Sequence, residues 1–267
     1  MMTLKIHLIA AARPNFMKIA PLYHALKKET WAETTIVHTG QHYELNMSDI
    51  FFQELGLPEP EIHLNIGSGT HAEQMGRVMI AYEKTLIEHK PNLVIVVGDV
   101  NSTAACTLSA TKLGIKIAHL EAGLRSFDKT MPEEINRIVT DSLADYLWTP
   151  SPDADKNLLK EGHSTDKISQ VGNIMIDSLE MMRGKIEQEN VCESLHLKKH
   201  KYCLVTLHRP SNVDNYNLLA QIMEALEEIS QHITVVFPVH PRTRNSLGKL
   251  KKYAYLANPI ESAIISS

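Results

Sequence analysis

The stretch Leu93-Val94-Ile95-Val96-Val97-Gly98-Asp99 decides the fold class of this chain. Its first five positions are all apolar, which is typical of a parallel strand that helices cover on both faces. The glycine that follows permits a tight turn, and the aspartate then stands at the carboxyl end of the strand. The stretch therefore predicts a buried strand that ends in a polar turn.

Short apolar runs alternate with amphipathic helical stretches around this strand. Strands are expected at 4–10, 35–38, 93–97, 116–120, 146–148 and 168–171. Helices are expected at 15–28, 46–55, 72–88, 102–113, 133–144 and 154–160. Such alternation predicts an α/β fold with a doubly wound, Rossmann-like domain over residues 1–172.

The alternation restarts after residue 172 and predicts a second α/β domain over residues 173–267. A helix is expected at 174–188, a strand at 202–206, a helix at 216–229 and a strand at 233–238. The remaining chain is shorter than the roughly 150 residues that a doubly wound domain usually needs. Residues 248–267 show no clear strand–helix unit, so we expect this domain to be incomplete.

The composition excludes several classes of protein. Of the 267 residues, 43% are hydrophobic and 22% are charged, as in ordinary globular proteins. The net charge of −4 offers no broad basic field to hold a nucleic acid. No apolar run approaches the ~20 residues of a membrane span. The cysteines are few and odd in number, and this pattern fits a reducing compartment. We expect a soluble, cytoplasmic protein that binds neither nucleic acid nor membrane.

Polar side chains follow the predicted strands at the edge where doubly wound sheets bind ligands. Arg13 and Lys18 stand near the start of the helix after the first strand, where two cations would suit a pyrophosphate. Asp99 and Glu121 follow two neighbouring strands, and such a pair of carboxylates suits general acid–base chemistry. As an alternative, Asp99 could cap the next helix.

A further acidic motif, Pro132-Glu133-Glu134-Ile135-Asn136-Arg137, opens a predicted helix. Acidic residues in a first turn stabilise the helix dipole whatever the function. Glu133 and Arg137 also have the spacing of an i, i+4 ion pair. Structural and catalytic roles both stay open for these two residues.

Two strands of the second domain end in histidine and arginine. His208 and Arg209 follow the strand at 202–206, and His240 follows the strand at 233–238. These cationic groups could receive a leaving phosphate.

None of the 14 histidines lies in an HExxH motif, so no metal site is predicted. The chain also lacks a GxGxxG fingerprint, a P-loop and a GxSxG elbow, which argues against dinucleotide-binding enzymes, NTPases and serine hydrolases.

Taken together, these motifs resemble those of the non-hydrolysing UDP-N-acetylglucosamine 2-epimerases. The resemblance runs from about residue 4 to about residue 245 and rests on Arg13-Pro14-Asn15-Phe16-Met17-Lys18, Thr39-Gly40-Gln41-His42-Tyr43, Gly67-Ser68-Gly69-Thr70, Gly98-Asp99, His119-Leu120-Glu121-Ala122-Gly123-Leu124-Arg125, Pro132-Glu133-Glu134-Ile135-Asn136-Arg137, Thr206-Leu207-His208-Arg209 and Pro238-Val239-His240-Pro241. It implies a two-domain fold of the glycosyltransferase-B type and a homodimer. The implied reaction converts UDP-GlcNAc to UDP-ManNAc, a precursor of surface polysaccharides, by elimination and re-addition of UDP without NAD or another cofactor.

The resemblance also implies roles for individual residues. The acid–base groups would be Asp99, Glu121 and Glu133, and His208 would assist the departure of UDP. Substrate would be held by Arg13, Lys18, Arg137 and His240. A second, regulatory UDP-GlcNAc site would involve Gln41, His42 and Arg209.

The chain departs from the family pattern after about Leu247. The family's Ser-Gly-Gly loop, its uridine-binding Glu and its Arg-Pro-Glu stretch are absent, as a truncated gene product or a cloned fragment would explain. One alternative is therefore a catalytically impaired remnant of the epimerase. The others are a hydrolysing epimerase that releases free ManNAc and a relative that acts on a 2,3-diacetamido uronic acid nucleotide.

Overall fold

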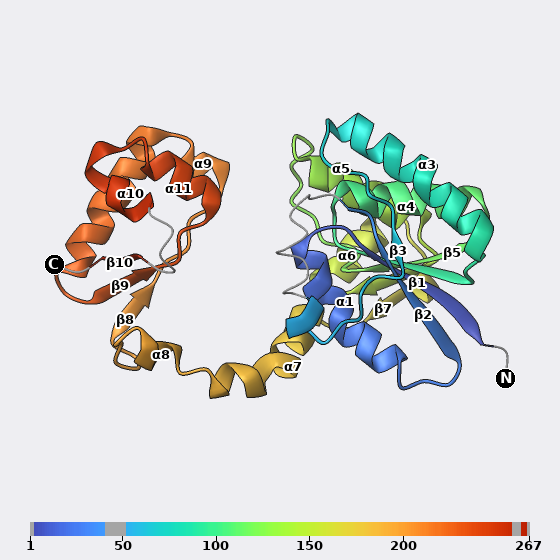
Figure 1. Ribbon diagram of the computed structural model, residues 1–267. Helices are drawn as coiled ribbons and strands as arrows, with labels where there is room; N and C mark the ends of the chain where they lie inside the picture. The colour runs from blue at the N-terminus through green and yellow to red at the C-terminus, as the bar shows by residue number, and fades with distance from the viewer. Residues whose placement is uncertain (1–2, 41–51, 258–262, 266–267) are drawn as a thin grey trace. The chain divides into compact units, whose positions relative to one another are not determined.

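The computed structural model describes residues 3–40, 52–257 and 263–265 (Figure 1). The chain forms two compact units, residues 1–186 and residues 187–267. The division falls within helix α7 (Ile174–Gln188), and not after residue 172. The first turns of α7 belong to the first unit because Ser178 Oγ donates a hydrogen bond to the Met17 carbonyl at 2.6 Å.

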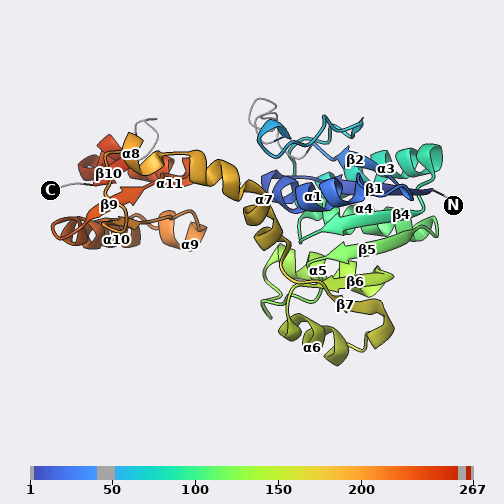
Figure 2. The same ribbon diagram turned by 90° about the horizontal axis from the view of Figure 1, so that it is seen from below.

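The first unit contains a parallel sheet of seven strands, in the order β3-β2-β1-β4-β5-β6-β7 (Figure 2). The strands are β1 (Leu4–Ala10), β2 (Ala32–His38), β3 (Ile62–His63), β4 (Leu93–Val97), β5 (Lys116–Leu120), β6 (Tyr146–Thr149) and β7 (Ile168–Gln170). The order reverses between β1 and β4, so these two strands form the switch point at which doubly wound sheets bind ligands. The predicted fold class is confirmed, although the short strand β3 was not predicted.

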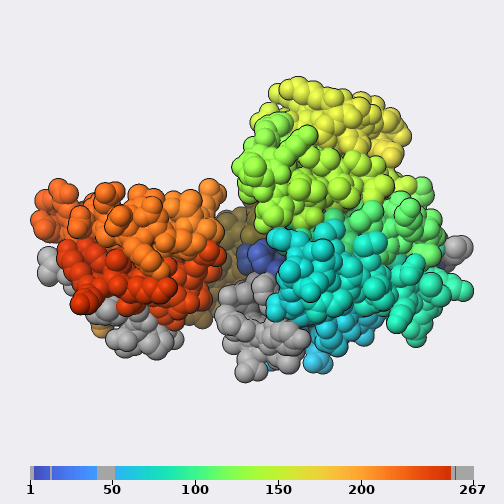
Figure 3. All heavy atoms as spheres, turned by 90° about the horizontal axis from the view of Figure 1, so that it is seen from above, coloured from blue at the N-terminus to red at the C-terminus, as the bar shows by residue number. Residues whose placement is uncertain are grey.

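Helices cover both faces of this sheet. They are α1 (Arg13–Leu26), α3 (His71–His89), α4 (Asn101–Lys112), α5 (Pro132–Leu143) and α6 (Pro152–Lys160), with a 3-10 turn η1 (Thr165–Lys167) before β7. Figure 1 shows α1 on one face and α3, α4 and α5 on the other. In the space-filling view, α3 lies alongside α4 and covers that face (Figure 3). The helix expected at 46–55 lies largely outside the described residues.

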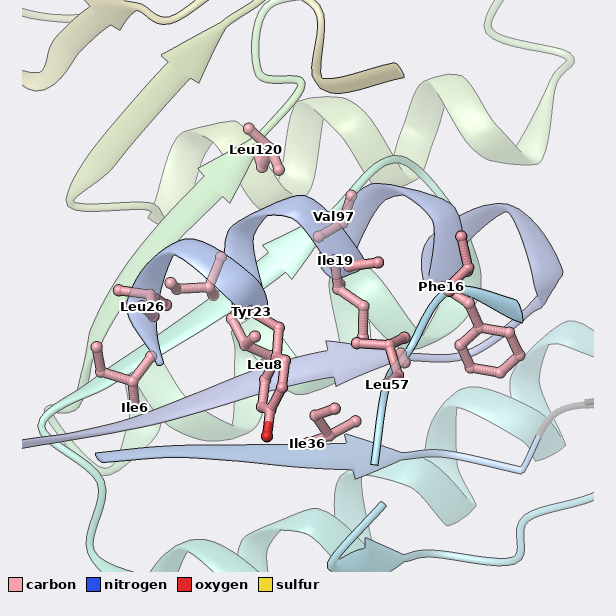
Figure 4. Close-up of a cluster of buried hydrophobic side chains, with 14 of the residues drawn as sticks. Ile6, Leu8, Phe16, Ile19, Tyr23, Leu26, Ile36, Leu57, Val97 and Leu120 are labelled. Atoms are coloured by element: carbon pink, nitrogen blue, oxygen red, sulfur yellow. The ribbon is translucent and has the colours of Figure 1, made fainter. Parts of the chain in front are cut away.

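Two apolar cores hold the layers together, one on each face of the sheet. On the α1 face, Ile19 and Tyr23 lie over Leu8 and Ile36 of the strands, and Phe16 lies beside Leu57 (Figure 4). On the opposite face, buried side chains of α3 and α4 form a second core together with side chains of the strands. Strand β4 is buried at four of its five positions, which explains its unbroken apolar sequence.

The second unit has a sheet of three strands in the order β10-β9-β8. Strands β8 (Tyr202–Leu204) and β9 (Thr234–Phe237) are parallel, and β10 (Ala263–Ile265) runs antiparallel to β9. The helices are α8 (Val191–Ser194), α9 (Pro210–Val213), α10 (Tyr216–Ser230) and α11 (Pro241–Leu247), followed by the 3-10 segment η2 (Lys251–Ala257). The sequence did not predict η2 or β10. No helix within the described residues is both long and apolar enough to cross a bilayer.

Candidate functional site

The candidate site lies at the carboxyl ends of β1, β4 and β5, which are adjacent in the sheet. Lys18 on α1 forms an ion pair with Glu121, the residue that follows β5, although 103 positions separate them. The side chains of Lys18 and Glu121 are 16% and 13% exposed. The strand order therefore brings together two predicted site residues in a place that water reaches poorly.

Glu121 adopts an uncommon backbone conformation. Its φ of +74° lies in the left-handed region, which costs a non-glycine residue about 1–3 kcal/mol. The backbone N–H groups of Glu121 and Ala122 both donate to the Trp148 carbonyl, at 3.1 Å each, and these bonds hold the turn. Strain of this kind is typical of functional sites, and here it turns the carboxylate toward Lys18.

Gly98, the residue that follows β4, lies against the Lys18–Glu121 pair. Its φ is +68°, and a Cβ on it would lie 3.3 Å from Lys18 Nζ and 3.4 Å from Glu121 Oε2. The Gly98 N–H donates to the Leu120 carbonyl at 3.1 Å. Glycine thus lets the turn after β4 approach the Lys18–Glu121 pair closely.

The next residue along the chain, Asp99, is paired with Arg137 of α5. Arg137 Nη2 lies 2.5 Å from Asp99 Oδ2, and Asn136 Nδ2 donates to the Asp99 carbonyl at 2.9 Å. Burial would lower the pKa of Arg137, but Asp99 and Glu134 raise that pKa above its ordinary value. The site therefore holds two carboxylate–cation pairs, one beside Gly98 and one formed by the residue that follows Gly98.

The acidic residue of α5 that pairs with Arg137 is Glu134. The prediction of a Glu133–Arg137 ion pair was wrong, because Arg137 Nη1 instead donates to Glu134 Oε2 at 2.9 Å. Glu134 also accepts the N–H groups of Ser126 and Phe127, at 2.9 Å each. Burial would raise the pKa of Glu134, but these bonds hold that pKa below its ordinary value. The side chain of half-buried Glu133 forms no ion pair or hydrogen bond among the described residues.

Asn15 is a site residue whose role the sequence reasoning missed. Its Oδ1 accepts the N–H groups of Ala11 and Ala12, and its Nδ2 donates to the Val97 carbonyl at 3.2 Å. Asn15 therefore ties the start of α1 to the end of β4 and supports the placement of Lys18 one turn later. Its position within the Arg13–Lys18 motif was the sequence feature that could have indicated this role. Arg13 is the first residue of α1, but its side chain lies outside the described part of the structure.

A buried charged cluster beneath the turn was also missed. His119 lies on β5, and its Nδ1 is 2.6 Å from Asp141 Oδ1. Both side chains are 0% exposed. Arg125 Nη2 lies 2.7 Å from Asp141 Oδ2 and 2.6 Å from Glu161 Oε2. Burial would raise the pKa of Asp141, but His119 and Arg125 hold that pKa below its ordinary value. The sequence signals for this cluster were the histidine inside the predicted strand 116–120 and the motif that contains both His119 and Arg125.

The second unit brings its two predicted histidines together. His208 and His240 follow β8 and β9, and their ring centroids lie 5.8 Å apart. His240 Nδ1 accepts the N–H of Arg242 at 3.2 Å and thereby caps α11. Arg242 forms a two-point ion pair with Asp214, whereas Arg209 is an exposed residue at the start of α9.

The remaining predictions concern the regulatory site and metals. Gln41 and His42 lie outside the described residues. Within the described part of the chain, no three His, Cys, Asp or Glu side chains cluster as metal ligands would. Cys106, Cys192 and Cys203 are free thiols.

Known proteins resemble this chain along most of its length. The family model described as UDP-N-acetylglucosamine 2-epimerase matches residues 24–264. A Methanococcus maripaludis protein named UDP-N-acetylglucosamine 2-epimerase is 43% identical over 250 residues, which are 92% of this chain and 68% of that protein. A Pseudomonas aeruginosa protein named UDP-2,3-diacetamido-2,3-dideoxy-D-glucuronate 2-epimerase is also 43% identical over 250 residues, covering 92% of this chain and 70% of that relative.

The fold is likewise similar to a solved structure. The crystal structure of Methanocaldococcus jannaschii UDP-GlcNAc 2-epimerase in complex with UDP-GlcNAc and UDP superposes with a TM-score of 0.83. The sequence identity is 42%, and the match covers 96% of this chain and 72% of that one.

Proposed function

The chain belongs to the UDP-N-acetylglucosamine 2-epimerase family, and from this premise we propose that it interconverts UDP-GlcNAc and UDP-ManNAc. Members with this name are isomerases, and the proposed reaction inverts carbon 2 of the sugar. The observation that carries the proposal within the fold is the presence of two carboxylate–cation pairs, Lys18–Glu121 and Asp99–Arg137, at the Gly98–Asp99 turn.

The proposed reaction has two steps that need a base and a place for negative charge. First, a carboxylate takes the proton from C2, the C1–oxygen bond breaks, and UDP leaves with the bonding electrons. The product of this step is a 2-acetamidoglucal with a double bond between C1 and C2. UDP then adds back to C1 while a proton is delivered to the opposite face of C2. Neither step changes the overall oxidation state of the substrate.

The side chains of the site supply the groups that this chemistry needs. A sheltered carboxylate suits removal of a weakly acidic proton, and Asp99, Glu121 and Glu133 are the proposed acid–base residues. Cations stabilise a departing diphosphate, which is the proposed role of Arg13, Lys18, Arg137 and His240, with His208 assisting departure. A regulatory role for Gln41, His42 and Arg209 also remains a proposal.

A second substrate class is supported by the Pseudomonas aeruginosa relative. Its identity to this chain equals that of the Methanococcus maripaludis protein, at 43%. The first-unit motifs do not separate the two sugars, because the proposed chemistry at C2 is the same for both. A UDP-2,3-diacetamido uronic acid is therefore the second candidate substrate.

We also propose a homodimer in a reducing cytoplasm, whose UDP-ManNAc would serve as a precursor of surface polysaccharide. The resemblance supports the dimer and the use of the product, and the three free thiols fit a reducing compartment. Light scattering of the purified chain tests the dimer, and a mass of one chain at all concentrations would contradict it.

The test of the function is an incubation with each candidate substrate, followed by anion-exchange chromatography and mass spectrometry. We expect UDP-GlcNAc to give an equilibrium mixture with UDP-ManNAc. Free ManNAc would indicate a hydrolysing enzyme, and conversion of the uronic acid nucleotide alone would favour the second candidate. A folded chain that converts neither nucleotide would contradict the proposal.

A further inference from the structure

His119 makes two contacts that together determine how many protons its ring carries. Its Nε2 lies 2.9 Å from the Gly98 carbonyl, and its Nδ1 lies 2.6 Å from Asp141 Oδ1. A carbonyl oxygen can only accept a hydrogen bond, so Nε2 must carry a hydrogen. The proton count of the ring therefore depends on Nδ1, and hence on the state of Asp141.

The surroundings of Asp141 favour its ionised form. Its Oδ2 lies 2.7 Å from Arg125 Nη2 and accepts the Gly123 N–H at 3.0 Å. An adjacent guanidinium and two or more hydrogen bonds stabilise a carboxylate over the neutral acid. An ionised Asp141 can only accept, so Nδ1 of His119 must donate as well. Both ring nitrogens then carry hydrogen, and His119 is an imidazolium.

The charges around His119 come from three segments. Asp141 lies on α5, Arg125 lies in the segment that follows β5, and Glu161 of the α6 end pairs with Arg125. Helix α4, which also packs on β5, contributes no carboxylate to this cluster among the described residues. Two cations and two carboxylates thus form an alternating chain, of which His119 is the innermost member. A buried charge is costly unless it is paired in this way.

The chain of contacts ends at the turn that bears Asp99. Helix α5 holds this turn at three points: Asn136 binds the Asp99 carbonyl, Arg137 binds the Asp99 carboxylate, and Asp141 reaches the Gly98 carbonyl through His119. Gly98 in turn lies against the Lys18–Glu121 pair. Movement of the Gly98 carbonyl would therefore displace both carboxylate–cation pairs.

We propose that His119 is a doubly protonated positioning residue, which holds the Gly98–Asp99 turn on α5 and so sets the geometry of the acid–base carboxylates. The positioning part of this inference rests on the proposed epimerase function. The protonation part does not, because it follows from the contacts of the ring alone.

The protonation is tested by ¹H–¹⁵N correlation NMR of the histidine rings in the unmodified 267-residue chain. Sequential assignment identifies His119, so no variant has to fold. At pH 8 we expect both His119 ring nitrogens to show bound protons, as in an imidazolium. A spectrum in which one ring nitrogen of His119 is bare at this pH would overturn the proposal.

The positioning is tested with Asp141→Asn. This substitution removes the negative charge that holds the second proton on His119 and changes the shape of the side chain little. We expect kcat to fall about 10- to 100-fold with KM within about twofold, because a displaced catalytic group slows chemistry more than binding. The matched control is Asp145→Asn, which removes a carboxylate at the other end of β5, where it pairs with Lys116. An unchanged kcat in Asp141→Asn would overturn the positioning role.

The two tests separate failure of this inference from failure of the proposed function. If the unmodified chain does not epimerise any substrate, the proposed function fails, and the ring spectrum still decides whether His119 is an imidazolium. If the chain epimerises but His119 is neutral, only the inference fails. If Asp141→Asn does not fold, the spectrum of the unmodified chain still decides whether His119 is doubly protonated.

Discussion

At the scale of single residues, Glu121 connects backbone conformation to chemistry. Its left-handed φ of +74° is unfavourable for a residue with a side chain, and the turn is held by two hydrogen bonds to the Trp148 carbonyl. The result is a carboxylate that is sheltered from water and paired with Lys18. The sequence predicted the residue and its place after β5, but not the strained turn, because φ depends on the bonds to β6.

Replacing Glu121 with Gln is expected to remove an acid–base group at nearly constant shape. We expect exchange of the substrate C2 proton to fall about 10²- to 10⁴-fold, the usual loss for a general acid–base group, in a chain that still folds. Deuterium incorporation measures the exchange. Glu180→Gln, an exposed pair with Arg183 on α7, serves as the matched control. Retained exchange in Glu121→Gln would reduce Glu121 to a structural partner of Lys18.

His7 is expected to make stability depend on pH. It is 2% exposed. Burial is the larger cause and the nearby His89 the smaller cause that lower its pKa from 6.5 to about 4. Between pH 6.5 and pH 4 the unfolded chain binds a proton here that the folded chain does not, so stability is lost as the pH falls. The shift corresponds to about 3 kcal/mol in the free energy of unfolding.

Urea unfolding at pH 7 and pH 4.5 measures this dependence. We expect the free energy of unfolding to fall less steeply with acidification in His7→Asn than in the unmodified chain. His232→Asn, at an exposed position in the second unit, controls for the loss of a histidine. The account of His7 fails when His7→Asn and the unmodified chain show the same pH dependence.

At the scale of elements, helix α5 organises the site. The sequence predicted a helix at 133–144, and the structure places it at Pro132–Leu143. Neighbouring positions on a helix point about 100° apart, so the choice between Glu133 and Glu134 depends on the path of the loop before α5. That loop presents the N–H groups of Ser126 and Phe127 to Glu134. Such tertiary contacts leave no periodic signal in the sequence.

The turn between β5 and α5 is predicted to be sensitive to a single methyl group at Gly123. Its φ is +79°, and a Cβ there would lie 2.5 Å from the Ala154 carbonyl oxygen. We expect Gly123→Ala to lower the free energy of unfolding by about 3 kcal/mol, from backbone strain together with the clash. Gly114→Ala is the matched control, since φ is +71° there and no atom lies within 4 Å. Gly114→Ala should cost about 1–2 kcal/mol, and equal losses in the two variants would contradict the clash.

At the scale of the whole molecule, the two units differ in how far the sequence predicted them. In the first unit, strand–helix alternation predicted the parallel sheet, and the rule for strand ends predicted where Lys18, Asp99 and Glu121 lie. The buried cluster of His119, Asp141 and Arg125 was not predicted, because a charged residue reveals its burial only through its partners. In the second unit, the tail gave no pattern for η2 or β10, since β10 depends on pairing with β9.

The most direct test of the epimerase assignment is proton NMR of UDP-GlcNAc incubated with the 267-residue chain in D₂O. We expect deuterium at C2 together with the signals of UDP-ManNAc, because the proposed elimination passes the C2 proton to a carboxylate that exchanges with solvent. A folded chain, shown by circular dichroism, that leaves both C2 and the UDP linkage unchanged would contradict the assignment.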